Sequence, residues 1–311
     1  MAIAIIAEYN PFHNGHIYQI NYVKKHFPND KIYVILSGNF VQRGEPAVAS
    51  FEQRKQIALA YGVDEVIRLP FKYATQAAHI FAKGAIEIIA KHNIDKLIFG
   101  SESNNIENLY FLANIIKNNL EEYNYNIKKN LKQGLSFPNS AAKSLSDLTG
   151  QAITLPNDIL GFEYIKQIVF NNYNIQAFSI KRTVNFHSLE ANNNFASATL
   201  LRQMIYKNID ISQFSPMKIE TKPLQIQDLY PQFQKVVINT PVDKLKQIHL
   251  VSEGMENLFK KHIDAPTFEE FINRTNSKRY TTSRIKRVML YVLLEIYNID
   301  DVKEETIQLT H

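Results

Sequence analysis

Short apolar runs alternate with stretches of helical spacing through the first third of this 311-residue chain. Alternation of this kind is typical of βαβ units, so it predicts an α/β fold built on a parallel sheet. Open parallel sheets bind ligands beyond the carboxyl ends of their strands, so the loops that follow the runs are the first candidates for a site. The runs are expected to form strands at residues 2–7, 31–37, 64–69 and 95–99.

The remainder of the chain is predicted to be mostly helical. Residues 106–170 have helical spacing, a further strand is expected at 174–180, and a helix is expected to begin near Ser197. Beyond that helix the alternation stops, and we interpret a segment punctuated by four prolines as a linker into C-terminal helices. Because domains average about 150 residues, we expect two of them, residues 1–207 and 208–311. The C-terminal helices are expected at residues 252–262, 267–275 and 283–297.

The chain contains no cysteine. That excludes a disulfide framework, a cysteine-ligated metal site and a thiolate nucleophile, so no acyl group can be carried on a thioester of this protein. The cytoplasm is therefore the expected compartment. The apolar N-terminus lacks a basic segment and is interpreted as a strand, and no apolar stretch reaches the ~18 residues of a membrane span. The formal charge of +5 permits a polyanionic partner without requiring one.

Directly after the first expected strand, a short segment combines a turn, a helix start and two histidines. Residues 8–16 read Glu-Tyr-Asn-Pro-Phe-His-Asn-Gly-His. A helix N-terminus offers free backbone N–H groups to a phosphate, and Gly15 lets the backbone approach it closely. His13 and His16 could donate hydrogen bonds to phosphate oxygens that gain charge in a transition state. Zinc also binds paired histidines, but two ligands without a nearby cysteine make an incomplete site, so no metal-ligand set is predicted here.

This segment resembles the HIGH motif of the nucleotidyltransferase and class I aminoacyl-tRNA synthetase superfamily, which activates substrates on the α-phosphate of ATP. Together with the segments that follow it in order, it resembles the tRNA(Met) cytidine acetate ligase family. The resemblance implies a Rossmann-like nucleotidyltransferase sheet in an ATP-binding domain, followed by a helical, tRNA-binding C-terminal domain. The later segments are 37–47 (SGNFVQRGEPA), 99–102 (FGSE), 155–161 (LPNDILG), 180–182 (IKR), 196–202 (ASATLLR) and 278–281 (KRYT).

The resemblance also implies a reaction. Acetate and ATP would give acetyl-adenylate and pyrophosphate, and the acetyl group would pass to N4 of the wobble cytidine, C34, of elongator tRNA(Met), forming N4-acetylcytidine. The expected partners are therefore ATP, acetate and elongator tRNA(Met), with no membrane and no protein partner inferred. Mg²⁺ is expected with the pyrophosphate, and Glu8 and Glu102 are candidate ligands.

The resemblance to the family also implies site residues at matching positions of this sequence. The catalytic candidates are His13, His16 and Arg182. Three of the site candidates have simpler alternatives: Gly100 as a strand-ending turn, Asn157 as a helix N-cap, and Arg182 as a solvated loop residue. Ser197 and Thr199 belong to a segment similar to the Ile-Ser-Ser-Thr-x-Ile-Arg signature of small adenylyltransferases, in which Arg202 follows one turn later. The ATP-binding candidates are Ala7, Glu8, Tyr9, Asn10, Pro11, Phe12, His13, Asn14, Gly15, His16, Gly100, Asn157, Arg182, Ser197 and Thr199.

The loop at residues 37–47 is a second candidate region. Arg43 and Asn39 could bind the small carboxylate or the tRNA, and the alternative is an ordered turn held by Gly44 and Pro46. The next segment departs from the family pattern, because residues 49–54 read Ala-Ser-Phe-Glu-Gln-Arg where an Asp-Lys pair is expected. That departure weakens any role for this helix start, although Arg54 remains.

A basic run near the C-terminus surrounds an expected helix start. Cations in a first helical turn oppose the helix dipole, so another interaction should favour them. RNA phosphate is the natural candidate, with a tyrosine available to stack on a base, and a solvated surface is the alternative. The tRNA-binding candidates are Lys278, Arg279, Tyr280, Arg284, Lys286 and Arg287.

Two other functions fit parts of the sequence. One is an adenylyltransferase that acts on a small phosphate-bearing metabolite, against which the basic C-terminal helices argue. The other is a catalytically silent RNA-binding protein, against which the intact motif at residues 13–16 argues.

Overall fold

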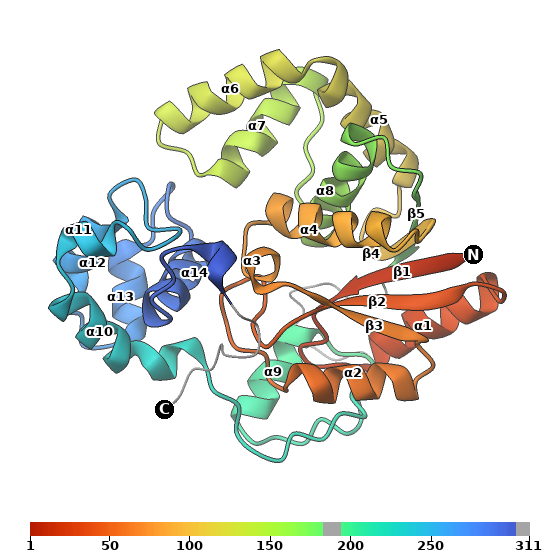
Figure 1. The fold of residues 1–311 in the computed structure, drawn as a ribbon, viewed down its shortest axis with the longest axis horizontal. Helices are drawn as coiled ribbons and strands as arrows, with labels where there is room; N and C mark the ends of the chain where they lie inside the picture. The colour runs from red at the N-terminus through yellow and green to blue at the C-terminus, as the bar shows by residue number, and fades with distance from the viewer. Residues whose placement is uncertain (183–193, 303–311) are drawn as a thin grey trace.

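A five-stranded parallel sheet lies at the centre of the N-terminal part of the molecule (Figure 1). It is seen in a computed structural model that describes residues 1–182 and 194–302. The strand order is β3-β2-β1-β4-β5, which confirms the predicted α/β class. The strands are β1 (Ala2–Ala7), β2 (Lys31–Ser37), β3 (Glu65–Leu69), β4 (Lys96–Ser101) and β5 (Gln176–Lys181).

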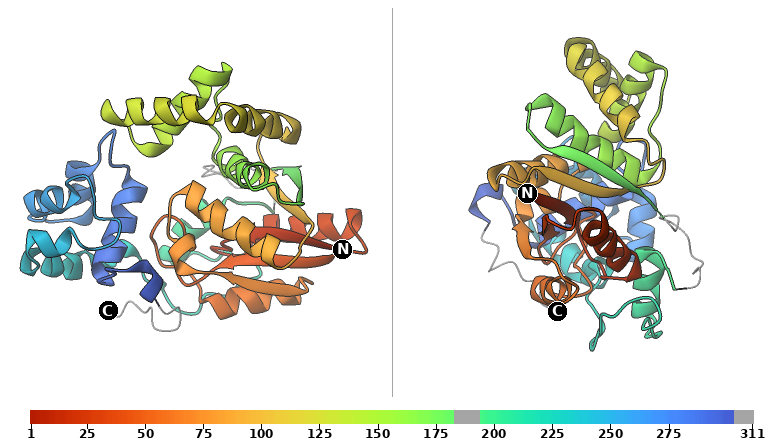
Figure 2. Two further views of the ribbon diagram at one scale, coloured as in Figure 1. Left: turned by 45° about the horizontal axis from the view of Figure 1, so that its top comes forward. Right: turned by 90° about the vertical axis from the view of Figure 1, so that its right-hand side faces the viewer.

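Helices cover both faces of the sheet (Figures 1 and 2). Two of them, α6 and α7, form a hairpin outside the main layers, joined by a buried hydrogen bond of 3.2 Å from Asn130 Nδ2 to Ser144 Oγ. The helices of this part are α1 (Asn14–His26), α2 (Phe51–Ala60), α3 (Phe71–Ala74), α4 (Ala78–Lys91), α5 (Ile106–Asn118), α6 (Leu120–Lys132), α7 (Phe137–Thr149), α8 (Pro156–Phe170) and α9 (Ala198–Tyr206).

The two faces of the sheet bury different clusters. Along β1, Ile3 and Ile5 pack with α1 and α2, whereas Ala4 and Ile6 pack on the side of α4, α5 and α8. Successive side chains of a strand point to opposite faces, so a strand covered on both faces is apolar throughout. This explains why the strands are continuous apolar runs in the sequence.

The C-terminal part is helical, as expected, but the segment interpreted as a linker contains a helix of its own. Pro231 lies in the first turn of α10, where a backbone N–H has no intrahelical acceptor. The N–H that proline lacks therefore costs no hydrogen bond, so the proline starts the helix and does not interrupt it. The elements here are η1 (Ile226–Leu229), α10 (Tyr230–Asn239), α11 (Val242–Leu245), α12 (Met255–His262), α13 (Phe268–Thr275), α14 (Thr282–Leu293) and η2 (Ile299–Asp301).

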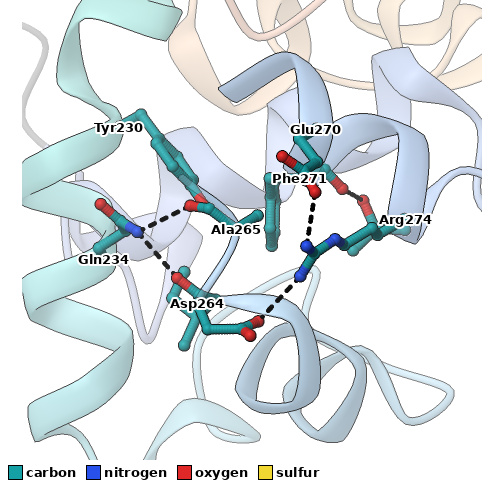
Figure 3. Close-up of polar contacts among 9 residues, drawn as sticks. Tyr230, Gln234, Asp264, Ala265, Glu270, Phe271 and Arg274 are labelled. Atoms are coloured by element: carbon teal, nitrogen blue, oxygen red, sulfur yellow. Dashed lines mark hydrogen bonds and ion pairs between the residues drawn. The ribbon is translucent and has the colours of Figure 1, made fainter. Parts of the chain in front are cut away.

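These helices enclose a separate aromatic core. The rings of Phe233, Phe259 and Phe271 lie 5.4–5.5 Å apart, and all three side chains are buried. Polar contacts tie α10 to the turn before α13 (Figure 3): Tyr230 Oη donates to the Ala265 carbonyl at 3.0 Å, and Gln234 Nε2 donates to the same oxygen at 3.1 Å. The burial of each donor is therefore compensated within the core.

The chain between the two parts packs on the sheet side at first. The Asn14 N–H donates to the Phe214 carbonyl at 2.8 Å, and Ser215 Oγ donates to the Phe12 carbonyl at 2.6 Å. The division at residues 207 and 208 stays a prediction. Within the described ranges, no helix is both long and apolar enough to cross a membrane.

Candidate active site

A cavity of about 440 Å³ lies beyond the carboxyl ends of β1, β4 and β5. β1 and β4 are adjacent in the sheet although β2 and β3 lie between them in the chain, so the strand order reverses here, where α/β sheets bind ligands. In Figure 1 the strands run from right to left, and this end faces the C-terminal helices. Residues 6–10, 41–43, 180–182 and the first turn of α8 contribute to the lining.

His13 and His16 form the N-terminus of α1. Nδ1 of His13 accepts a hydrogen bond from the Gly15 N–H, Nδ1 of His16 accepts one from the His13 N–H, and both distances are 3.1 Å. The rings stack with centroids 3.8 Å apart. A Cβ on Gly15 would lie 2.8 Å from His13 Cε1, so the motif needs glycine there. Because each neutral ring accepts at Nδ1, its proton sits on Nε2 and can be donated to a ligand.

Both histidines are neutral donors. Burial lowers the pKa of His13 to about 3, and the charges of Arg182 and Arg202 contribute to the shift. Burial also lowers the pKa of His16 well below its usual value, with His13 and Arg182 as further causes. Desolvation penalises the imidazolium form, so at neutral pH this site holds uncharged N–H donors.

Two arginines bring positive charge to the cavity. Arg182, at the end of β5, donates from Nη1 to Asn157 Oδ1 at 3.3 Å. Arg202 of α9 donates from Nη1 to the Asn10 carbonyl at 2.8 Å and from Nη2 to Thr199 Oγ1 at 3.3 Å. Arg202 was not among the site candidates, although its place in the adenylyltransferase-like segment was the signal that could have identified it. Guanidinium groups suit phosphate oxygens.

Glu102 is a structural partner of α8. Its carboxylate accepts hydrogen bonds from the backbone N–H groups of Asn157 and Asp158, both at 3.1 Å, and from Asn157 Nδ2 at 2.6 Å. The N-cap residue of α8 is Leu155, whose side chain cannot cap, so Glu102 satisfies the free N–H groups instead. Asn157 is therefore not the N-cap; it links Glu102 to Arg182 and lines the cavity.

Comparison with known proteins agrees with this geometry. The family model described as HIGH Nucleotidyl Transferase matches residues 1–309. The chain is 60% identical over 309 residues to the tRNA(Met) cytidine acetate ligase of Mesomycoplasma hyopneumoniae strain 232, covering 99% of this chain and 98% of that protein. The chain belongs to the tRNA(Met) cytidine acetate ligase family. The corresponding ligase of Mycoplasmopsis pulmonis is 57% identical over 298 residues, covering 96% and 100% of the two chains.

Solved structures of this ligase family share the fold. Apo Thermotoga maritima TmcAL has a TM-score of 0.86 and 32% identity, covering 95% of this chain and 76% of that one. The same protein bound with alpha-thio ATP has a TM-score of 0.84 and 31% identity, covering 95% and 75%. The Rossmann-like nucleotidyltransferase fold expected from the sequence is confirmed.

The cavity brings together most of the ATP-binding candidates. They are Ala7, Glu8, Tyr9, Asn10, His13, Gly15, His16, Gly100, Asn157 and Arg182. A Cβ on Gly100 would lie 3.3 Å from Arg182 Cγ, so a larger residue there would press on the arginine. The roles of all these residues in ATP binding stay predictions.

Five candidates lie outside the lining: Pro11, Phe12, Asn14, Ser197 and Thr199. Phe12 is fully buried in the core beneath α1, and Ser197 caps α9 by accepting the Leu200 N–H at 3.1 Å. These positions support the walls, and the alanines on either side of Ser197 reach the cavity. Their direct contact with ATP also stays a prediction.

Only part of the loop at residues 37–47 lines the cavity, and the rest bonds to neighbouring backbone. Arg43 lines the cavity, whereas Asn39 accepts the Phe51 N–H at 2.9 Å through Oδ1 and does not line it. Glu8 Oε1 accepts the Gln42 N–H at 2.8 Å, which places Gln42, a residue that sequence reasoning missed, beside the motif. Arg54 is fully buried and donates to backbone carbonyls, including Glu8 O at 2.6 Å, so it holds this loop against β1.

Much of the basic run near the C-terminus is engaged within the protein. Lys286 Nζ pairs with Glu45 Oε1 at 2.5 Å, and Arg284 Nη1 pairs with Glu253 Oε2 at 2.8 Å. Arg287 donates from Nη1 to the Gln42 carbonyl at 3.4 Å. The start of α14 therefore rests against the loop that lines the cavity. The predicted contacts of this run with tRNA stay predictions.

Proposed function

We propose that this protein is an ATP-dependent ligase that activates acetate as acetyl-adenylate and transfers the acetyl group to N4 of C34 in elongator tRNA(Met). One observation carries the proposal: a histidine-capped helix N-terminus and two arginines share one cavity, in a chain 60% identical to a tRNA(Met) cytidine acetate ligase. The metabolite adenylyltransferase and the silent RNA-binding protein are not favoured by these relatives.

In the first step, an acetate oxygen attacks the α-phosphorus of ATP. The bond from that phosphorus to the bridging oxygen breaks, pyrophosphate leaves, and negative charge builds on the α-phosphate oxygens. His13 and His16 donate Nε2–H bonds to these oxygens, and the N-terminus of α1 adds its partial positive charge. Neutral donors fit this task because their bonds strengthen as charge develops.

Arg182 and Arg202 bind the phosphates in this proposal. Asn157 orients Arg182 through its Oδ1, and Glu102 in turn holds Asn157. The planar guanidinium can pair two phosphate oxygens at once, which positions the α-phosphate for in-line attack. Arg182 thus contacts the reacting group, and Asn157 acts as its positioning residue.

Mg²⁺ is expected to accompany the triphosphate. It binds through one or two carboxylates together with substrate phosphates and water. Glu8 lines the cavity and fits that role, whereas Glu102 is bonded to the N-terminus of α8 and lies outside the lining. In the part of the chain that the structure describes, no three His, Asp or Glu side chains group as a metal site. When bound, the ion neutralises charge on the departing pyrophosphate.

In the second step, the exocyclic amine of cytidine attacks the acetyl carbonyl and AMP leaves. The nucleotide must be splayed out of the anticodon loop to reach the cavity, which is how single-stranded RNA loops are commonly read. A tRNA substrate also agrees with the cytoplasmic location expected from the sequence. Residues 208–311 would contribute to tRNA binding in this scheme.

The test is incubation of the protein with labelled acetate, ATP and bulk tRNA, followed by nucleoside analysis. We expect ATP-dependent label in N4-acetylcytidine. ATP consumption without label in RNA would instead support the metabolite enzyme, and the absence of any consumption would support a binding protein.

A further inference from the structure

The α6–α7 hairpin carries basic side chains that the cavity does not use. Lys128, Lys129 and Lys132 are exposed on α6, and Lys143 is exposed on α7. Within residues 1–182 and 194–302, none of these four side chains forms a hydrogen bond or an ion pair. The helix dipole favours cations in the last turn of α6, but it does not explain Lys143 in the middle of α7. The hairpin thus presents charge that has no partner among the described residues.

The hairpin joins part of the basic run from the distant end of the chain. The Ser136 N–H donates to the Lys278 carbonyl at 3.0 Å, and Arg279 Nη2 donates to the Leu131 carbonyl at 3.5 Å. In Figures 1 and 2 the tip of the hairpin approaches the C-terminal helices. Two basic segments that are far apart in sequence therefore form one region. We call it the hairpin surface: Lys128, Lys129, Lys132, Lys143, Lys278 and Arg279.

The hairpin surface lies next to the cavity. Phe137, the first residue of α7, packs on His79 with ring centroids 4.5 Å apart. The neighbouring residue, Ala78, lines the cavity. The tip of the hairpin therefore lies close to the cavity lining, within reach of a polymer that delivers one nucleotide to the cavity.

The same face of α6 carries an exposed aromatic ring. Tyr125 is 67% exposed and precedes Lys128 and Lys129 by one turn, so the three side chains are neighbours on the helix surface. Proteins that bind single-stranded RNA combine cations for the phosphates with aromatic rings that stack on bases. Tyr125 provides the aromatic ring, and the lysines of the hairpin surface provide the cations.

The C-terminal run alone leaves few cations for RNA. Lys286 and Arg284 have carboxylate partners, and the half-buried Arg287 donates a hydrogen bond to the Gln42 carbonyl. We propose that the hairpin surface binds the phosphate backbone of the tRNA substrate beside the anticodon loop. This inference rests on the proposed function, since it takes tRNA to be the substrate.

The test replaces three lysines of α6 in the full chain, as K128E/K129E/K132E. The matched control is K25E/K31E/K91E, which makes the same charge change at exposed lysines near the amino ends of the strands, opposite the cavity. Binding of an elongator tRNA(Met) transcript is measured across a series of KCl concentrations, together with KM values for tRNA and ATP. Each phosphate contact contributes about 0.7–0.9 to the slope of log affinity against log salt.

We expect the α6 variant to lose about tenfold or more in tRNA affinity and about two units of that slope. Its KM for tRNA should rise while its KM for ATP does not change, and the control should match the wild type. Wild-type affinity and slope in the α6 variant, or an equal loss in the control, overturns the proposal. If the wild type forms no N4-acetylcytidine while its tRNA affinity still depends on these lysines, the proposed function fails and the surface stands.

Discussion

His13 and His16 depend on each other for their local structure. Nδ1 of each ring accepts a backbone N–H, so neither ring can turn without removing a cap from α1. The same bonds leave the Nε2–H groups available in the cavity. Burial keeps both rings neutral, so the motif provides preorganised donors and no permanent positive charge.

The lowered pKa values predict acid sensitivity of folding. Between the usual histidine pKa near 6.5 and the folded value of about 3 for His13, the unfolded chain binds a proton that the folded chain does not. The free energy of unfolding should therefore fall as pH decreases through this window, by about 1.4 kcal/mol per pH unit for each histidine. Urea unfolding at pH 7 and pH 5 measures this loss.

A pair of variants assigns the effect. His13→Asn retains a capping side chain but removes one titrating group, so it should reduce the pH dependence of unfolding. His92→Gln removes an exposed histidine outside the cavity and should retain the wild-type dependence. Equal pH dependence in the wild type and His13→Asn would contradict the assignment.

At the scale of elements, α14 and the cavity loop approach each other at backbone distance. Gly44 has φ of 75°, and a Cβ there would lie 2.5 Å from Arg287 Cα. The Lys286–Glu45 ion pair lies beside this contact. The helix and the loop therefore behave as one packed unit, and anything that separates them should disturb the cavity wall.

Gly44→Ala tests this contact, with Gly134→Ala as its control. Gly134 also has positive φ, at 87°, but a Cβ there meets no atom within 4 Å. Gly134→Ala should cost about 1 kcal/mol from backbone strain alone. Gly44→Ala should cost a further 1–3 kcal/mol or so, because the alanine overpacks against α14, and it should raise the KM for ATP. Equal losses of unfolding free energy in the two variants would show that the close approach is unimportant.

At the scale of the whole molecule, the C-terminal helices support the cavity. Arg287 donates to the Gln42 carbonyl, and the Gln42 N–H donates to Glu8 beside the motif. Arg287 is half-buried, and desolvation together with the charge of Arg284 lowers its pKa to about 10. A guanidinium that holds a cavity loop is a positioning residue, a different role from the tRNA contact expected from the sequence.

Arg287→Met separates these two roles. Loss of this hydrogen bond should lower the stability of the loop by about 1–3 kcal/mol. In acetate-dependent ATP–pyrophosphate exchange without tRNA, it should raise the KM for ATP about fivefold or more. Lys261→Met, which alters an exposed lysine of α12, is the control and should match the wild type. If Arg287→Met changes the KM for tRNA but not the exchange reaction, Arg287 is an RNA contact and not a positioning residue.

The sequence by itself determined the sheet, most of the helices and the turn and helix start at residues 8–16. These features depend on periodicity, on helix capping and on segments close together in the chain, all of which can be read locally. Even the error at Pro231 was local, since a proline can start a helix as well as interrupt one.

Only the tertiary structure decided how the charged residues are used. Glu102 caps α8, Arg54 holds the loop after β2, and Arg287 supports that loop from the far end of the chain. Each group has a partner 16 to 245 positions away in the sequence, so burial and pairing appear only when the chain is folded. The sequence shows where a charge occurs, but desolvation and the nearest partner decide what that charge does.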